Sequence, residues 1–405
     1  MPLKCGVAQR LESGELAAET GHWLLEIVKR TDAYRFVVLL ERWIGEMRRI
    51  LVTGALGQIG SELVPALRQR FGDDRIIASD LGMVPPQGPP VRVPYEHVDC
   101  AQPHQILEVV RRYNIGTIYH LAALLSAVAE EKPQVAWNVN IGGLNNVLQV
   151  ARQYGCRVFF PSSIGAFGPS TPRDRTPQVT IQRPTTMYGV TKVSGELLCD
   201  YYASRFGVDT RGLRLPGLIS HVAPPGGGTT DYAVDIFHQA LRYKHYTCFL
   251  GPSTRLDMMY MPDAIRAMIE LMVVDATRLR HRNAYNVAAM SFTPSELAER
   301  IRWHIPEFTI DYCVDPVRQA IADSWPCSFD DTAAREDWGW SARFDLQAMT
   351  ADMFAQLREK LKAPKGELIR RWRGCDADAK TERDTRVEAQ GAGASRQAQG
   401  HGQHH

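Results

Sequence analysis

A tyrosine and a lysine lie four residues apart in the segment PTTMYGVTK, as Tyr188 and Lys192. The following residues predict a helix that runs to Arg205, and residues four apart project from one face of a helix. An ammonium beside a phenol favours the phenolate, so a tyrosine, whose ordinary pKa is about 10, can act as a base nearer neutral pH. The pair predicts proton abstraction from a substrate; the alternative is a solvated pair on a helix surface.

A pair of serines offers a third polar group. Residues 157–160 (RVFF) predict a short strand that runs into Ser162 and Ser163. A hydroxyl there can bind the substrate oxygen while Tyr188 takes its proton. We choose Ser163 over Ser162 as the third catalytic residue; the alternative is that both serines cap the following turn.

A glycine-rich loop, TGALGQIG, lies between a predicted strand (48–53) and a predicted helix (61–71). Gly54 allows a tight turn, Gly57 lets backbone N–H groups approach a pyrophosphate, and Gly60 lets the helix and strand pack closely. The helix N-terminus adds positive potential. The loop predicts a dinucleotide site, although a glycine triplet by itself also fits a merely tight turn.

An acidic residue decides which dinucleotide is expected. Asp80 follows a second predicted strand (75–79), twenty residues after Gly60, where a carboxylate accepts hydrogen bonds from the adenosine ribose. It disfavours a 2′-phosphate, and residues 81–83 include no arginine to receive one. NAD is therefore predicted over NADP, and its positive nicotinamide ring would further favour the phenolate of Tyr188.

Other residues are assigned to the cofactor from their position beside these strands and the loop. They are Gln58, Ile59, Asp99, Leu121, Ala122, Ala123, Asn140 and Leu215, together with Tyr188 and Lys192. Small residues at 122–123 serve equally for packing, and a structural hydrogen bond is as good an explanation of Asn140 as a cofactor contact.

Strands alternate with helices from residue 48 onward, with further strands at 117–121 and 157–160. This order predicts an α/β fold, a Rossmann-type doubly wound parallel sheet with a smaller C-terminal α/β substrate-binding domain. We assign residues 47–220 to the NAD-binding domain, to which segments from 240–290 return, and residues 221–362 mainly to the substrate domain.

The two ends of the chain differ from the middle. Met47 directly precedes the first predicted strand, so residues 1–46 are either native or an upstream extension. Their acidic residues do not fit a mitochondrial transit peptide. Residues 363–405 are charged, small and polar, and are expected to be a disordered tail.

The composition excludes several classes of function. The chain has 405 residues, 47 Lys and Arg against 45 Asp and Glu, and a net charge of +2, so no excess charge attracts nucleic acid or an anionic membrane. No apolar run approaches the roughly 20 residues that span a bilayer. Eight scattered cysteines form no metal-ligand pattern and suit a reducing compartment. We expect no metal site. We expect a soluble protein of the cytoplasm, or of the mitochondrial matrix if the source is eukaryotic.

The motifs at Gly54, Gly57 and Gly60, at Asp80, and at Tyr188 and Lys192 resemble the extended short-chain dehydrogenase/reductase superfamily. Within it, residues 47–361 are most similar to the short-chain, NAD-dependent L-threonine 3-dehydrogenases. The segments that carry this likeness are LVTGALGQIGSEL, YHLAALLSAVAE, PSSIGAFGP, PTTMYGVTK, LRLPGLIS, PGGGTTDYAV and MMYMPD.

The resemblance implies oxidation of the L-threonine β-hydroxyl to 2-amino-3-oxobutyrate. It implies Tyr188 as the base, Lys192 as the group that orients the ribose, and Ser163, often a threonine in the family, as the hydroxyl ligand. The substrate contacts that it implies are Ser126, Ser163, Thr186, Tyr188, Thr229, Thr230 and Trp325. It also implies a homodimer that pairs the helix of Tyr188 with a second helix at 136–151.

Two other functions remain open at this point. The same Tyr/Lys/Ser set serves nucleotide-sugar epimerases and dehydratases, which often keep a phosphate-binding arginine near the position of Arg255. A non-catalytic NAD-sensing protein on the same fold is the second alternative. For Gly226 to Gly228 a plain flexible turn is an alternative to a hinge, and for Trp325 an ordinary core position is an alternative to a pocket wall.

Overall fold

The computed structural model describes residues 48–82, 93–224, 226 and 228–362. The predicted extension at 1–46 and the predicted tail at 363–405 lie outside the described residues, as do Pro225 and Gly227. No described helix is long and apolar enough to cross a membrane.

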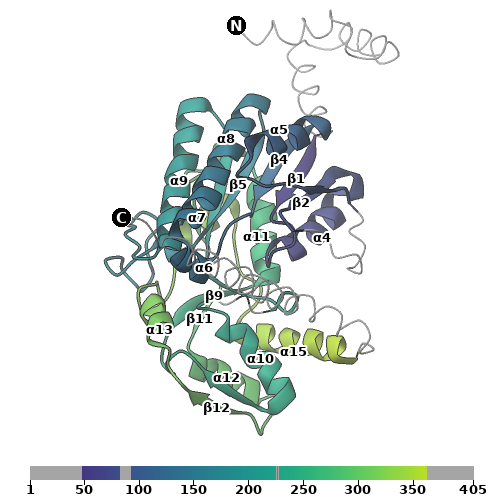
Figure 1. Ribbon diagram of the computed structural model, residues 1–405. Coiled ribbons are helices and arrows are strands. Elements are labelled where there is room, and N and C mark those ends of the chain that lie inside the picture. The colour runs from purple at the N-terminus through teal and green to yellow at the C-terminus, as the bar shows by residue number, and fades with distance from the viewer. Residues whose placement is uncertain (1–47, 83–92, 225, 227, 363–405) are drawn as a thin grey trace, which may run out of the picture.

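Seven parallel strands form the main sheet, in the order β10-β6-β5-β4-β1-β2-β3 (Figure 1). Their bounds are β1 Arg49–Thr53, β2 Ile76–Asp80, β3 Tyr95–His97, β4 Ile115–His120, β5 Arg157–Ser163, β6 Thr210–Leu215 and β10 Tyr285–Asn286. Apolar β-branched runs such as RILVT form strands that are buried on both faces, as parallel sheets require. The predicted doubly wound parallel sheet is confirmed.

Helices cover both faces of this sheet. On one face α5 (Pro103–Arg112), α8 (Gly143–Tyr154) and α9 (Met187–Phe206) share a core with Leu51 of β1. On the other face α4 (Gly60–Phe71), α11 (Met261–Val273) and α14 (Thr332–Trp338) share a core with Val52. Neighbouring residues of one strand thus enter opposite cores, because side chains alternate along a strand.

A second group of elements has its own core. Its strands are β7 (Gly217–Ile219), β8 (His245–Cys248), β9 (Leu256–Tyr260), β11 (Met290–Phe292) and β12 (Thr309–Tyr312), paired as β11-β9-β7 and β12-β8. Its helices are α10 (Tyr232–Tyr243), α12 (Pro294–Arg302), α13 (Pro316–Asp323) and α15 (Leu346–Lys362). The boundaries of the two domains stay a prediction. Although α11 and β10 follow β9 in the chain, α11 packs in a core of the main sheet and β10 pairs with β6 of that sheet.

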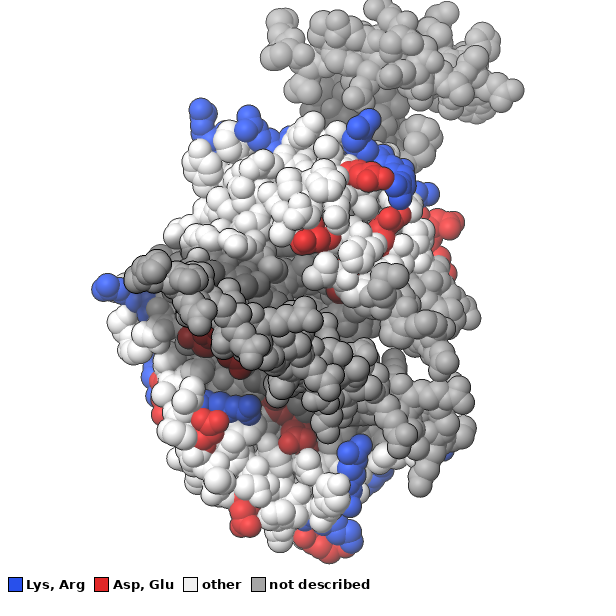
Figure 2. All heavy atoms as spheres, viewed as in Figure 1, with Lys and Arg blue, Asp and Glu red and all other residues white. Residues whose placement is uncertain are grey.

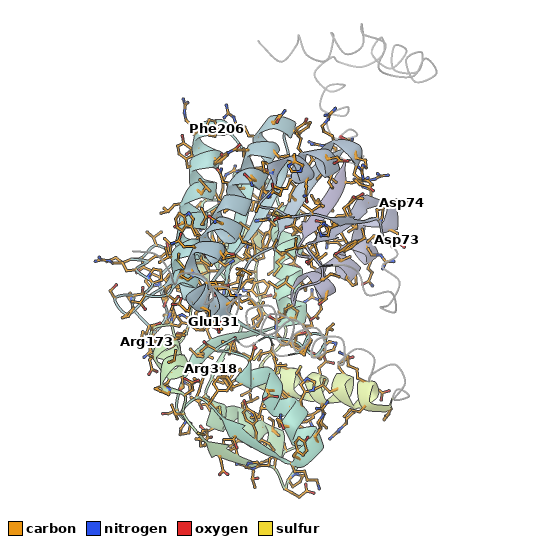
Figure 3. All side chains as sticks on the ribbon, viewed as in Figure 1. Asp73, Asp74, Glu131, Arg173, Phe206 and Arg318 are labelled. Carbon is orange, nitrogen blue, oxygen red and sulfur yellow. The ribbon has the colours of Figure 1, made fainter. Side chains whose placement is uncertain are left out.

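Two short helices, α6 (Ser126–Glu131) and α7 (Pro133–Trp137), and a π-helical turn, Asn138–Gly142, connect β4 to α8. In Figure 3, Phe206 at the end of α9 lies far from the C-terminal elements, so the first turn of α9, with Tyr188, lies nearer to them. Over α8 and α9 the face in Figure 2 is mostly uncharged. The predicted homodimer stays a prediction; Leu197 and Tyr201 of α9 are exposed apolar residues that such a pairing would cover.

Candidate active site

The glycine loop between β1 and α4 has no room for a side chain at Gly54 or Gly60. Gly54 has φ +69°, and a Cβ there would lie 2.7 Å from the Ala122 nitrogen. A Cβ on Gly60 would lie 2.3 Å from the Gly54 carbonyl oxygen. Helix α4 begins at Gly60 without a side-chain cap, so its positive end is available to a phosphate group. The backbone therefore fits the close approach that a dinucleotide requires.

Asp80, at the end of β2, lies beside this loop. One carboxylate oxygen accepts from the Leu56 N–H at 2.9 Å and the other accepts from the Gly82 N–H at 3.0 Å. Asp99, after the neighbouring strand β3, instead accepts from the Ala101 N–H at 2.9 Å. The carboxylate of Asp80 is thus held next to the loop by backbone donors, in the position from which we expect it to bind the ribose hydroxyls.

We predict that Asp80→Ser will weaken NAD binding by about 30- to 150-fold, because charge-assisted hydrogen bonds to the ribose are worth about 2–3 kcal/mol. NADP binding should change much less, so the preference for NAD narrows. Titration of both cofactors measures this. The matched control is Asp74→Ser, which removes the same charge from an exposed position just before β2; equal effects of the two variants would contradict the assignment.

Asn140 links the end of β4 to helix α9. Its side-chain oxygen accepts from the Leu124 N–H at 2.8 Å, and its amide nitrogen donates to the Leu124 oxygen at 3.2 Å and to Thr191 Oγ1 at 3.1 Å. Thr191 in turn donates to the Tyr188 carbonyl at 2.8 Å. The buried amide therefore has structural partners, placed by a π turn of the kind that often occurs at functional sites. Its predicted contact with the cofactor stays a prediction.

Two side chains cap the N-terminus of helix α9. Thr186 Oγ1 accepts from the Gly189 N–H at 3.1 Å, and Glu130 Oε1 of α6 accepts from the Met187 N–H at 2.6 Å. Two of the N–H groups that a helix leaves unpaired are thereby satisfied. Thr186, predicted as a substrate contact, thus has a capping role, and Glu130 was not singled out by the sequence.

Tyr188, Lys192 and Ser163 come together where β5 ends and α9 begins. The Lys192 ammonium donates to the Pro161 carbonyl at 2.7 Å and lies 5.3 Å from the centre of the Tyr188 ring. The Ser163 hydroxyl lies beside the Tyr188 phenol, whose pKa it lowers. Ser163 Oγ also accepts from the Gly165 N–H at 3.1 Å, and Gly165 leaves space for the Tyr188 ring, which would lie 3.2 Å from a Cβ there. The two motifs are thus one cluster in space.

Burial sets the charge states in this cluster. It raises the pKa of Tyr188 to about 12, although the Ser163 hydroxyl beside the phenol lowers it. It lowers the pKa of Lys192 to about 8, against the charge of Glu196, which raises it. In the free protein Tyr188 is therefore a phenol, and a further positive charge is needed before it serves as a base at neutral pH.

The two serines of β5 have different partners. Ser162 is buried and donates a hydrogen bond to Glu196, whereas Ser163 is the last residue of the strand and faces Tyr188. Because successive side chains of a strand point to opposite faces, only one of two adjacent serines can reach the tyrosine. Leu215 is the register partner of Ser163 on β6.

The remaining predicted substrate residues lie on separate elements. Ser126 is the first residue of α6, which packs against α9. Thr229 is buried, and the methyl group of Thr230 lies against Gly217, where an added Cβ would meet it at 2.6 Å. Trp325 is buried in the core of the C-terminal elements, which is the core position that the sequence left open. Their contacts with substrate stay predictions.

Comparison with known proteins identifies the class: this protein is an NAD-dependent oxidoreductase of the extended short-chain dehydrogenase/reductase superfamily. Residues 50–288 match the model of the "NAD dependent epimerase/dehydratase family". The chain belongs to this family. The predicted resemblance and the predicted cofactor, NAD, are confirmed.

Individual proteins resemble the chain over most of its length. An uncharacterized epimerase/dehydratase of Staphylococcus aureus is 52% identical over 314 residues, 78% of this chain and 98% of the relative. The structure is similar to that of L-threonine dehydrogenase from Clostridium difficile, with a TM-score of 0.76 and 54% identity over 78% of this chain and 98% of the other. It is also similar to the holo form of a GalE-like L-threonine dehydrogenase from Cupriavidus necator, with a TM-score of 0.74 and 53% identity over 76% and 99% of the two chains.

Proposed function

We propose that this protein oxidises the β-hydroxyl of L-threonine with NAD and forms 2-amino-3-oxobutyrate. The observation that carries the proposal is the cluster of Tyr188, Lys192 and Ser163 at the end of β5 and the start of α9. The names of the similar solved structures supply the substrate. Production of NADH from NAD and L-threonine is the test.

In this mechanism the substrate hydroxyl lies between Ser163 and Tyr188. NAD, when bound, would supply a hydride acceptor and a positive charge. The ammonium of Lys192 would orient the nicotinamide ribose, and the added positive charge of the cofactor would lower the pKa of Tyr188 from its value in the free protein. Tyr188 then takes the hydroxyl proton, Ser163 holds the oxygen, and the C–O bond becomes a carbonyl.

We predict that Ser163→Ala will lower kcat/KM about 100-fold, because one positioned hydrogen bond to the reacting oxygen is lost. Ser163→Thr should retain activity within about threefold, since it keeps the hydroxyl that the proton transfer uses. Steady-state rates with L-threonine measure both. Full activity of Ser163→Ala would remove this hydroxyl from the mechanism.

Arg255 bears on the nucleotide-sugar alternative. Its guanidinium donates to the Ser291 carbonyl at 2.9 Å and pairs with Glu296 at 2.5 Å. An arginine already neutralised by a carboxylate is a weak site for a diphosphate, which favours the amino-acid substrate. An epimerase would convert an added nucleotide sugar, and an NAD-sensing protein would bind NAD tightly without turnover.

A further inference from the structure

A third ionisable side chain continues the line of Tyr188 and Lys192 along α9. Glu196 follows Lys192 by four residues, so all three project from one face of the helix. Both Lys192 and Glu196 are buried, at 5% and 2% exposure. Carboxylates are almost never this buried unless they are paired, so Glu196 requires partners.

Each oxygen of Glu196 has several partners. The Ser162 hydroxyl donates to Oε1, and Arg214 donates from Nη2 to Oε2 at 2.8 Å and from Nε to both oxygens at 3.1 and 3.2 Å. The Gln182 amide also donates to Oε2, at 3.0 Å. The carboxylate is therefore fixed, and it holds the residue adjacent to Ser163.

Arg214 ties this carboxylate to the sheet. It donates from Nη1 to the Gln178 carbonyl at 2.7 Å and to Asn286 Oδ1 at 3.2 Å, and lies 5.2 Å from the centre of the Phe167 ring. The pair thus connects α9, β5, β6 and β10. A buried ion pair is weak evidence for stability, because desolvation of the two charges offsets their attraction. We therefore explain the position of the Glu196–Arg214 pair by a role in the candidate active site.

The charges that face Lys192 come from several elements. His120 at the end of β4 is buried, and burial and the Lys192 charge lower its pKa to about 3, so it is neutral. Tyr188 on α9 is a phenol in the free protein. Beyond Glu196, Asp200 on the same helix interacts with both Glu196 and Arg214. Among these groups Glu196 is the negative charge that opposes the loss of the Lys192 proton on burial, and the positive charge of Arg214, paired with it at 2.8 Å, partly offsets this effect.

We propose that Glu196 and Arg214 form a positioning pair: the Glu196 carboxylate fixes the end of β5 through Ser162 and keeps the buried Lys192 ammonium charged, while Arg214 holds the carboxylate in place. The inference rests on the proposed function only for the role of Lys192 at the nicotinamide ribose. Neither residue of the pair touches the substrate.

The test measures NADH affinity between pH 6 and 10 for the wild-type protein and for Glu196→Gln. Nicotinamide fluorescence reports the binding. In the wild type we expect affinity to fall as pH rises through about 8, as Lys192 loses its proton. In Glu196→Gln the midpoint should move down by about one pH unit, because an opposite charge beside the ammonium is lost. Lys192→Met should bind weakly throughout and show no midpoint in this range.

A second variant keeps the test decisive. Glu196→Gln leaves Arg214 unpaired and can unfold the chain, so Glu196→Gln/Arg214→Met removes both charges together. Its midpoint should also move down, but by less than in Glu196→Gln, because a positive charge is lost as well. A uniform loss of affinity with an unchanged midpoint would mean a merely structural pair and would overturn the proposal, as would a wild type without a midpoint. Because NADH is the probe, absence of L-threonine turnover would defeat the proposed function and leave this inference standing.

Discussion

Tyr188→Phe should lower turnover by about 10³-fold, within the range that general acid–base catalysis supplies. The variant removes only the phenolic oxygen, and the ring keeps its place beside Gly165 and Lys192. The substrate hydroxyl then has no phenolic oxygen beside it to accept its proton. Steady-state NADH formation with L-threonine measures the loss.

Cofactor binding is the control for this variant. NAD and NADH affinities should stay within about threefold of wild type, because the glycine loop and Asp80 are unchanged. Tyr201→Phe, the same change at an exposed tyrosine of the same helix, should leave turnover unaltered. Turnover near the wild-type rate in Tyr188→Phe would remove this residue from the mechanism.

Gly60→Ala should weaken NAD binding by about 100-fold, equivalent to about 2.7 kcal/mol. The new Cβ would lie 2.3 Å from the Gly54 carbonyl oxygen and 2.6 Å from the Ala55 Cα, both backbone atoms. The loop must then move away from α4, and the backbone donors no longer converge on the pyrophosphate. Fluorescence titration with NADH measures the affinity.

The matched control is Gly142→Ala, a second helical glycine, at which a Cβ meets nothing within 4 Å. This substitution should leave NAD binding unchanged and, by helix propensity, cost no stability. Comparable losses of affinity in both variants would show that the effect comes from helix changes in general. Wild-type affinity in Gly60→Ala would contradict the assignment of the loop.

The elements that carry the motifs could be predicted from the sequence to within a few residues. The predicted strand at 75–79 is β2, Ile76–Asp80, and the predicted helix at 61–71 is α4, Gly60–Phe71. Their signals are local: an apolar run for the strand, helical periodicity for the helix, and glycines at the turn between them. The proximity of Asp80 to the glycine loop could be predicted as well, because both follow neighbouring predicted strands.

The long-range partners could not be predicted in this way. Glu196 and Arg214 are separated by 18 residues and lie on different elements, and no local pattern marks them as a pair. Strand β10 has two residues, too few for a periodic signal, and its place at the sheet edge follows from pairing with β6. The capping bond that the Met187 N–H donates to Glu130 likewise depends on the packing of α6 against α9.

The pKa of Tyr188 in the structure differs from the value that the sequence predicts. The spacing of Tyr188 and Lys192 predicts a tyrosine with a lowered pKa, but burial raises it to about 12 in the free protein. Desolvation depends on every atom around the phenol, which the spacing of two residues does not contain. The lowering must come with the cofactor, so activity is expected to depend on the charge of the nicotinamide ring as well as on Lys192.

The most direct test of the central proposal is the absorbance of NADH formed when purified protein is mixed with NAD and L-threonine. L-serine, D-threonine, L-allo-threonine and a nucleotide sugar replace L-threonine in parallel reactions, and NADP replaces NAD. We predict NADH formation that is confined to L-threonine with NAD and is lost in Tyr188→Phe. Tight NAD binding with no NADH formed from L-threonine would contradict it.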